Sequence, residues 1–170
     1  MTGLPVVSCG IAAESPTAGP PETDREMGPR LIESRRFGPL EVWPDKVITF
    51  PMGLIGFEEF RQYVLVAPEG LEPLSFRVAL DDPDVAFPVL PGELCLPGYA
   101  PTIPSETLDI IGGGPGGHVE ILAICATAPD TGTLHANLRG PVVVNPATRT
   151  ACQAVLHDGN YSLRHLLGAG

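Results

Sequence analysis

From Phe37 onward the chain is a series of short apolar runs separated by clusters of Pro, Gly and Asp, and this spacing constrains the fold more than any other feature. None of the runs is long enough to require a long helix. Short runs bounded by turn residues are typical of the strands of a sandwich or barrel. The predicted strands are Leu40–Trp43, Val47–Phe50, Tyr63–Ala67, Leu74–Leu80, Val85–Leu90, Val119–Thr127, Leu134–Leu138, Val142–Asn145 and Thr150–Leu156. The sequence therefore predicts an all-β fold, a small and mainly antiparallel barrel or sandwich.

One or two short helices are expected beside these strands. The segment Ser105–Ile111 has a helical pattern, with Ser105 placed to cap the first turn and acidic residues near its positive end. A further helical turn is predicted for Phe57–Gln62.

Three prolines lie inside or beside predicted strands, at Pro51, Pro88 and Pro141. Because proline has no N–H for the ladder, each is expected at a sheet edge, a strand start or a bulge. Such edges favour a small barrel with irregular edges, to which a strand or helix of a partner can dock.

The first 34 residues differ in composition from the rest. They hold five prolines, four glycines and no aromatic residue, and no helical or strand period runs through them. Disorder is predicted for residues 1–34, a single β domain for residues 35–167 and a short tail for residues 168–170. The apolar stretch Leu4–Ala13 has no Lys or Arg before it, so it lacks the charged region of a signal peptide, and a cytoplasmic protein is expected. No stretch approaches the ~20 apolar residues of a membrane span.

The negative charge is concentrated in the middle of the chain. The net charge is −10, and between Glu41 and Asp130 fourteen Asp and Glu stand against three Lys and Arg. Such a field repels phosphate backbones and attracts basic proteins, so direct nucleic-acid binding is not expected. A role of the acids in solubility alone remains open.

Neither a metal nor a cofactor is predicted. Cys9, Cys95, Cys125 and Cys152 are widely separated, without the clustered spacing of zinc ligands, and Cys125 and Cys152 fall inside predicted strands as small hydrophobes. The run Gly112–Gly117 formally matches G-x-G-x-x-G. It leads into a strand rather than a helix, so it is interpreted as a loop.

The sequence does not indicate an enzyme. Asp81-Asp82-Pro83-Asp84 stands between two predicted strands and is good turn chemistry, and the four histidines are dispersed. The alternative hypothesis is a small-molecule-binding or hydrolytic β-barrel that uses Asp81, Asp82 and His135.

Four segments together resemble the FliW family of bacterial flagellar assembly factors. They occur in the family's order between Phe37 and Leu167. They are Ile48–Glu58, Asp81–Val89, Asn137–Asn145, and Gln153–Leu156 followed by Tyr161–His165. The chain departs from the family pattern at Val78-Ala79, where a Gln-Ser pair is frequent, and at His135-Ala136, where Thr and an aliphatic residue are usual.

The resemblance implies a non-enzymatic β protein with two partners, the RNA-binding regulator CsrA and flagellin. The protein is expected to antagonise CsrA and to bind flagellin in a chaperone-like, mutually exclusive manner, which couples flagellin translation to assembly. The residues expected to bind partners are Asp81, Asp82, Phe87, Asn137 and Arg139.

The side chains of the first segment are expected to act as scaffold. Phe50, Leu54 and Phe57 are predicted to fold back onto the core. Asn137 is an amide within an apolar run, so its polar atoms must be either satisfied internally or used for contact.

Overall fold

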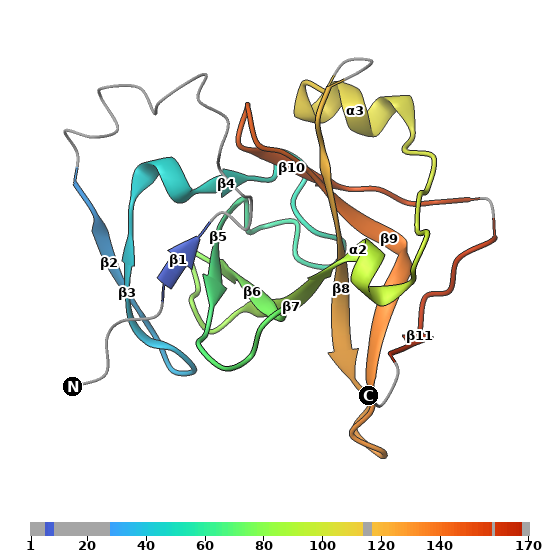
Figure 1. The fold of residues 1–170 in the computed structure, drawn as a ribbon. Coiled ribbons are helices and arrows are strands. Elements are labelled where there is room, and N and C mark those ends of the chain that lie inside the picture. Colours follow the sequence, from blue (N-terminus) through green and yellow to red (C-terminus); the bar gives the residue numbers. More distant parts are fainter. Residues whose placement is uncertain (1–5, 9–27, 114–116, 158, 168–170) are drawn as a thin grey trace.

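The computed structural model describes residues 6–8, 28–113, 117–157 and 159–167, and its centre is a closed β-barrel (Figure 1). Around the barrel the strands follow the order β5-β4-β10-β9-β8-β7-β6, and β6 pairs again with β5 to close it. The strands are β4 (Ile48–Thr49), β5 (Gln62–Ala67), β6 (Ser75–Ala79), β7 (Ala86–Pro91), β8 (Glu120–Thr127), β9 (Leu134–Asn145) and β10 (Thr150–Gln153). All neighbours are antiparallel except β4 and β10, which are parallel. The predicted mainly antiparallel all-β fold is confirmed, in its barrel form.

Among the described residues, four further strands lie outside this ring. The hairpin of β2 (Arg30–Ser34) and β3 (Gly38–Val42) forms a sheet of its own. The short strands β1 (Val6–Ser8) and β11 (His165–Leu166) pair with β5 and β9. Strand β2 lies before residue 35, the predicted start of the β domain, and it pairs with β3 of that domain. The rest of the predicted disordered segment, residues 1–5 and 9–27, and the tail 168–170 lie outside the described residues.

Strand β5 is buried on both faces, and this explains its unbroken apolar sequence. Tyr63 and Leu65 point into the barrel core with Ile48, Phe50, Leu54, Val89, Leu122, Val142 and Val144. Val64 and Val66 point outward, where the β2–β3 hairpin covers them. The hairpin contributes Ile32, Leu40 and Val42 to this second cluster, and the cluster also contains Phe76, Val78 and Leu80.

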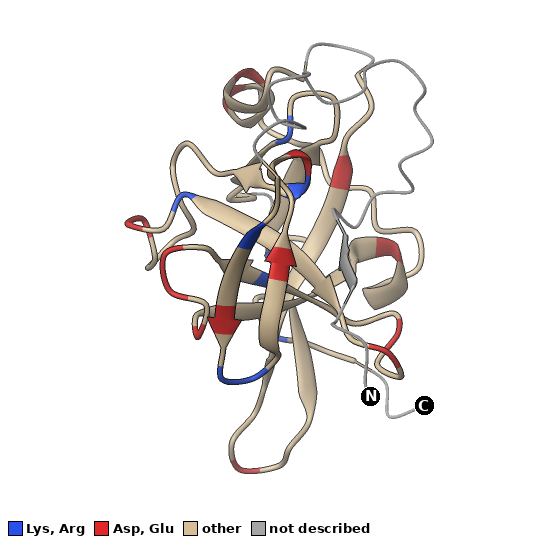
Figure 2. Cartoon of the chain, turned by 90° about the vertical axis from the view of Figure 1, so that its left-hand side faces the viewer, with Lys and Arg blue, Asp and Glu red and all other residues tan. Residues whose placement is uncertain are grey.

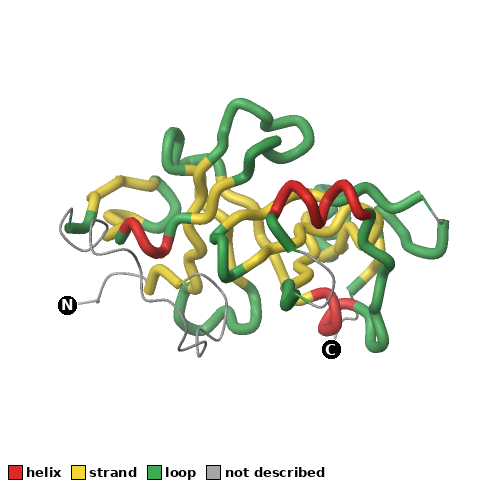
Figure 3. The backbone as a smooth tube through the Cα atoms, turned by 90° about the horizontal axis from the view of Figure 1, so that it is seen from above, coloured by secondary structure: helices red, strands yellow, loops and turns green. Residues whose placement is uncertain are grey.

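The described residues contain two α-helices and one 3₁₀ turn, and both α-helices lie on the side of the barrel away from the hairpin (Figure 3). Helix α3 (Ser105–Ile111) has the predicted bounds, but Pro104 rather than Ser105 occupies the N-cap position, without a side-chain capping bond. Helix α2 (Gly92–Cys95) and the turn η1 (Pro44–Lys46) were not predicted. The turn predicted for Phe57–Gln62 is present as a single hydrogen-bonded turn, in which the N–H of Phe60 donates to the carbonyl oxygen of Phe57 at 3.1 Å, and it does not continue into a helix.

Two of the prolines confirm the expectation for their positions. Pro88 lies opposite Phe76 of β6, and the pairing of β7 with β8 begins one residue later, at Val89. Pro141 lies in a bulge, because residues 138–141 of β9 face only Ala123 of β8. The two strands predicted on either side of this bulge are one continuous strand, β9.

Candidate functional site

The first, third and fourth of the four segments that carry the family resemblance meet at the side chain of Gln153. Its amide nitrogen donates to the carbonyl oxygen of Gly140 at 3.0 Å, and its amide oxygen accepts from the backbone N–H of Ile55 at 3.0 Å. Gln153 thus joins the loop after β4 to the bulge of β9. Since both amide groups are used, the loop is held in one position relative to the barrel.

The first and second segments meet through aromatic rings. The rings of Phe57 and Phe87 lie edge to face, with centroids 4.9 Å apart and an interplanar angle of 76°. The ring of Phe87 also lies 6.2 Å from that of Tyr63, which is fully buried. Phe87 is half-buried and connects the loop with the barrel core.

The loop between β4 and β5 presents apolar side chains to solvent. Phe50 and Leu54 are buried in the barrel core, as predicted, whereas Met52 and Ile55 are 59% and 61% exposed. Phe57, predicted on the core, is 37% exposed. Val155 is also exposed and lies two residues after Gln153 on the same outward-facing side, because Ala154 and Leu156 between and beyond them are buried. We call Met52, Ile55, Phe57 and Val155 the apolar surface.

Glycine is required at one position of this loop. Gly53 has φ +68°, and a Cβ there would lie 2.5 Å from the Cα of Glu58. Its N–H donates to the carbonyl oxygen of Phe50 at 2.9 Å. This turn keeps Met52 and Ile55 on the outside while Leu54 points inward.

Two charged side chains of the loop, those of Glu58 and Arg61, form hydrogen bonds with backbone groups of the same loop. The carboxylate of Glu58 accepts the N–H of Gly56 at 2.9 Å, and backbone hydrogen bonds from Gly56 and from Glu58 itself lower the pKa of this carboxyl. The guanidinium of Arg61 donates to the carbonyl oxygen of Glu58 at 2.6 Å and to that of Pro51. The loop is thus closed by its own polar groups.

The predicted contact residues Asn137 and Arg139 have structural bonds in the bulge of β9. The side-chain oxygen of Asn137 accepts the N–H groups of Arg139 at 3.1 Å and Gly140 at 2.9 Å. The Nε of Arg139 donates to the carbonyl oxygen of Leu156 at 3.4 Å. Of the two roles open to the Asn137 amide oxygen, the structure shows internal satisfaction.

The predicted contact residues Asp81 and Asp82 are exposed and belong to the turn between β6 and β7. The carbonyl oxygen of Asp82 accepts the N–H of Val85 at 2.8 Å, and its carboxylate accepts that of Asp84 at 3.2 Å. Asp84 in turn forms an ion pair with Arg35 at 3.3 Å, which ties the turn to the end of the β2–β3 hairpin. The interpretation of this segment as a turn is correct.

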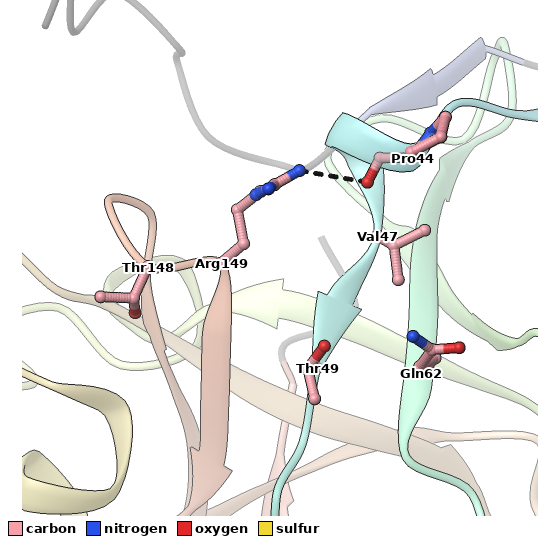
Figure 4. Close-up of a pocket in the computed structure, with 6 residues that line it drawn as sticks. All are labelled: Pro44, Val47, Thr49, Gln62, Thr148 and Arg149. Carbon is pink, nitrogen blue, oxygen red and sulfur yellow. Dashed lines mark hydrogen bonds between the residues drawn. The ribbon is translucent and has the colours of Figure 1, made fainter. Parts of the chain in front are cut away.

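The alternative hypothesis of a catalytic barrel gains no support from the pocket in Figure 4. This open depression of about 220 Å³ is lined by Pro44, Val47, Thr49, Gln62, Thr148 and Arg149. Arg149 donates to the carbonyl oxygen of Pro44 at 3.1 Å. Neither Asp81, Asp82 nor His135 lines it, and His135 lies in β9 opposite Leu166 of β11.

The described part of the chain has neither a cluster of metal-ligating side chains nor a helix that could span a membrane. Within residues 6–8, 28–113, 117–157 and 159–167, no three His, Cys, Asp or Glu side chains are grouped so as to hold a metal ion. No helix among these residues has the length and apolar character needed to cross a membrane.

Sequence reasoning did not single out Gln153, Met52, Ile55 or Val155. Met52 and Ile55 each stand directly before a glycine with positive φ, Gly53 or Gly56, and this pairing was the available signal. Gln153 had no such signal, because its partner Ile55 is 98 residues away in the sequence.

Comparisons with known proteins identify a family for this chain. The family model described as FliW protein matches residues 31–167. The flagellar assembly factor FliW of Geotalea uraniireducens (strain Rf4) is 35% identical over 134 residues, which are 79% of this chain and 82% of that protein. The flagellar assembly factor FliW of Thermotoga neapolitana is 31% identical over 142 residues, covering 81% and 93% of the two chains.

A solved structure has the same fold. The crystal structure of a flagellar assembly factor FliW superposes with a TM-score of 0.74 and 26% sequence identity, covering 82% of this chain and 97% of the other. The chain therefore belongs to the FliW family, the family that its four sequence segments predicted.

Proposed function

We propose that this protein is a flagellar assembly factor that acts by binding two proteins in turn. It sequesters CsrA and so relieves repression of flagellin translation, and newly made flagellin displaces CsrA in a chaperone-like complex. Membership of the FliW family is the observation that carries this proposal. The protein works in the cytoplasm, without enzymatic activity and without direct contact to nucleic acid or membrane.

The apolar surface suits the apolar face of a flagellin helix. Met52 and Ile55 stand out from a loop whose backbone is fixed by Gly53, Gln153 and Arg61. A preorganised apolar surface loses little conformational entropy on binding. Amphipathic helices dock to such surfaces through apolar side chains one turn apart.

The resemblance to the family implies that CsrA is a basic protein. The acidic turn at Asp81 and Asp82 is therefore complementary to it in charge. Phe87 follows this turn in the chain and contacts Phe57, so the acidic turn and the apolar surface are mechanically connected. Asn137 and Arg139 contribute indirectly, since their bonds in the β9 bulge hold Gly140 where Gln153 binds it. Mutual exclusion of the two partners follows if both cover the Phe57–Phe87 contact.

A titration of labelled CsrA with the full chain tests the function. CsrA is expected to bind, and saturating flagellin is expected to raise the apparent Kd for CsrA at least tenfold. Linkage requires CsrA to weaken flagellin binding by the same factor. Unchanged CsrA affinity in saturating flagellin would contradict the exchange mechanism, and failure of both partners to bind would contradict the proposed function.

A pair of substitutions tests the assignment of the apolar surface. Met52→Ala with Ile55→Ala is expected to weaken flagellin binding more than tenfold, because large apolar side chains at a contact centre dominate affinity. Leu31→Ala is the matched control, since Leu31 is similarly exposed but lies in β2. Equal effects of the control and the double variant would reject this surface.

A further inference from the structure

The carboxylate of Asp84 is held in place by the backbone of the β2–β3 hairpin. Asp84 ends the acidic turn between β6 and β7, and its Oδ1 accepts the backbone N–H of Arg35 at 2.9 Å. The N–H of Asp84 itself donates to the carboxylate of Asp82 at 3.2 Å. Since both bonds involve backbone groups, the position of this carboxylate does not depend on the Arg35 side chain.

The other oxygen of the same carboxylate is paired with a side chain that lies almost entirely in solvent. The Nε of Arg35 lies 3.3 Å from Oδ2 of Asp84, and the Arg35 side chain is 93% exposed, against 44% for that of Asp84. Exposed ion pairs contribute little to stability, because two long side chains lose conformational freedom and water screens their charges. The guanidinium of Arg35 is therefore easily replaced by another cation at Asp84.

The next arginine of the hairpin tip is directed elsewhere. The guanidinium carbon of Arg36 lies 5.5 Å from the centroid of the Phe76 ring, in a cation–π contact. The backbone N–H groups of Arg36 and Phe37 donate to Oγ of Ser34 at 3.2 and 3.3 Å. The tip thus carries two arginines that are neighbours in the sequence, one paired with the acidic turn and the other with an aromatic ring.

We propose that Asp84 is a contact residue for CsrA, at which a basic side chain of CsrA replaces the guanidinium of Arg35. This inference rests on the proposed function, which places the basic partner at the exposed residues Asp81 and Asp82 of the same turn. The guanidinium already seated on Asp84 shows that a cation fits against this carboxylate. Arg35 is then an internal competitor of the partner's cation.

Competition within the chain gives a prediction of unusual direction. The apparent affinity for a partner is reduced when only a fraction of the molecules is in the binding-competent state. Loss of the Arg35 side chain removes the competitor, so it is expected to strengthen CsrA binding. Truncation of a side chain that itself contacts the partner would weaken binding instead.

The test compares Arg35→Ala with Arg36→Ala in the full chain, by calorimetric titration with CsrA. Each variant removes one positive charge and changes the net charge from −10 to about −11, so the long-range attraction of CsrA increases equally in both. Only Arg35→Ala also releases Asp84. Its Kd for CsrA is expected to be about two- to fivefold lower than that of Arg36→Ala, the range of an exposed ion pair.

Asp84→Asn completes a double-mutant cycle with Arg35→Ala. The amide oxygen of the asparagine still accepts the backbone N–H of Arg35, so the turn keeps its anchor while the charge is lost. In this background Arg35→Ala and Arg36→Ala are expected to bind CsrA equally. A stronger binding of Arg35→Ala that persists without the Asp84 charge would overturn the proposal.

Two further results would also overturn it, and both leave the proposed function standing. Weaker CsrA binding by Arg35→Ala than by Arg36→Ala would show that Arg35 supports the partner, and equal binding would show that Asp84 takes no part. If CsrA binds none of the chains, the proposed function fails and a hexa-arginine peptide decides on the site alone. Preference of this peptide for Arg35→Ala over Arg36→Ala would support a cation site at Asp84, and equal binding would reject it.

Discussion

Tyr63 is a buried polar residue of the barrel, and buried polar groups ordinarily have hydrogen-bond partners. Its side chain is fully buried, and its hydroxyl has no hydrogen-bond partner within the described part of the chain. Burial raises the pKa of Tyr63 to about 12 from 10.0. A buried polar group without a partner costs free energy, and it makes the stability depend on pH where the group ionises.

Tyr63→Phe is expected to leave the free energy of unfolding at pH 7 unchanged or to raise it by about 1–3 kcal/mol. Above pH 10 the unfolded state ionises at Tyr63 while the folded state does not, so the wild-type protein loses stability as the pH rises toward 12. The variant should lose less. Urea unfolding at pH 7 and pH 11 measures both effects, with Tyr161→Phe as the control that keeps the alkaline loss. Destabilisation of Tyr63→Phe at pH 7 would show that the hydroxyl has a stabilising partner.

The loop glycines give a second prediction at this scale. Gly53→Ala places a Cβ 2.5 Å from the backbone of Glu58, whereas Gly56→Ala, in the same loop and also at positive φ, meets no atom within 4 Å. Gly56→Ala is expected to cost about 1–2 kcal/mol from the left-handed conformation alone. Gly53→Ala should cost clearly more and should also weaken flagellin binding, because the backbone must shift. Equal losses of stability in the two variants would show that the loop accommodates the Cβ.

The sequence could be interpreted at some residues and not at others. Phe50 and Leu54 were correctly predicted in the core, but the same reasoning placed Phe57 there too, and its side chain is 37% exposed. For Asn137 the sequence left two roles open, internal hydrogen bonding and partner contact, because an amide in an apolar run indicates only that its polar atoms need partners. Gln153 could not be identified, because its function depends on Ile55 and Gly140 being brought together by the barrel.

At the scale of elements, local pattern predicted most strands, and long-range pairing decided the rest. The strand β9 was divided into two predicted strands because Gly140 and Pro141 interrupt its pattern, yet the bulge accommodates both residues. The parallel contact of β4 with β10 is short: Thr49 lies opposite Thr150, and the N–H of Thr49 donates to the carbonyl oxygen of Arg149 at 2.9 Å. No local pattern indicates such a contact.

The hairpin strand β2 was missed for a related reason. Of its two apolar residues Leu31 is exposed and only Ile32 is buried, so β2 contributes one apolar side chain to the core. The hairpin is nevertheless an integral layer of the fold, because Ile32 packs with Leu40 and Val42 over the outer face of β5 and β6.

Two truncations test this layer. Deletion of residues 1–34 removes β2 and exposes Leu40 and Val42 of β3, so the Tm is expected to fall by more than ~5 °C. Deletion of residues 1–27 keeps β2 and removes only the three-residue β1 from the described elements, so it should change the Tm less. Thermal unfolding followed by circular dichroism measures both. If the protein lacking residues 1–34 had the same Tm as the wild-type protein, β2 would be dispensable and the domain would begin at the boundary that the sequence predicted.

At the scale of the whole molecule, the sequence predicted the fold class and the family, because the four segments lie on structural turns and core positions that the barrel needs. The distribution of charge required the structure. Figure 2 shows the acidic residues on several separate loops and strands, so the net charge of −10 acts as a field over the molecule rather than as one patch.

Acidic residues can contribute to CsrA binding in two ways, by long-range attraction and by direct contact, and a pair of matched variants can distinguish these contributions. Asp81→Asn with Asp82→Asn removes two charges at the proposed contact, and Glu106→Gln with Asp109→Asn removes two exposed charges in α3. Both variants change the net charge from −10 to about −8. At low salt, both are therefore expected to associate with CsrA more slowly than the wild-type protein, by a similar factor. At high salt, where the charges are screened, both should associate as fast as the wild-type protein. Only the variant at Asp81 and Asp82 should also speed dissociation, because only it removes groups that touch the partner. Stopped-flow association and dissociation at two salt concentrations measure the four rates. An unchanged dissociation rate in the Asp81 and Asp82 variant would leave these residues with a steering role alone and would place the CsrA contact on another face of the barrel.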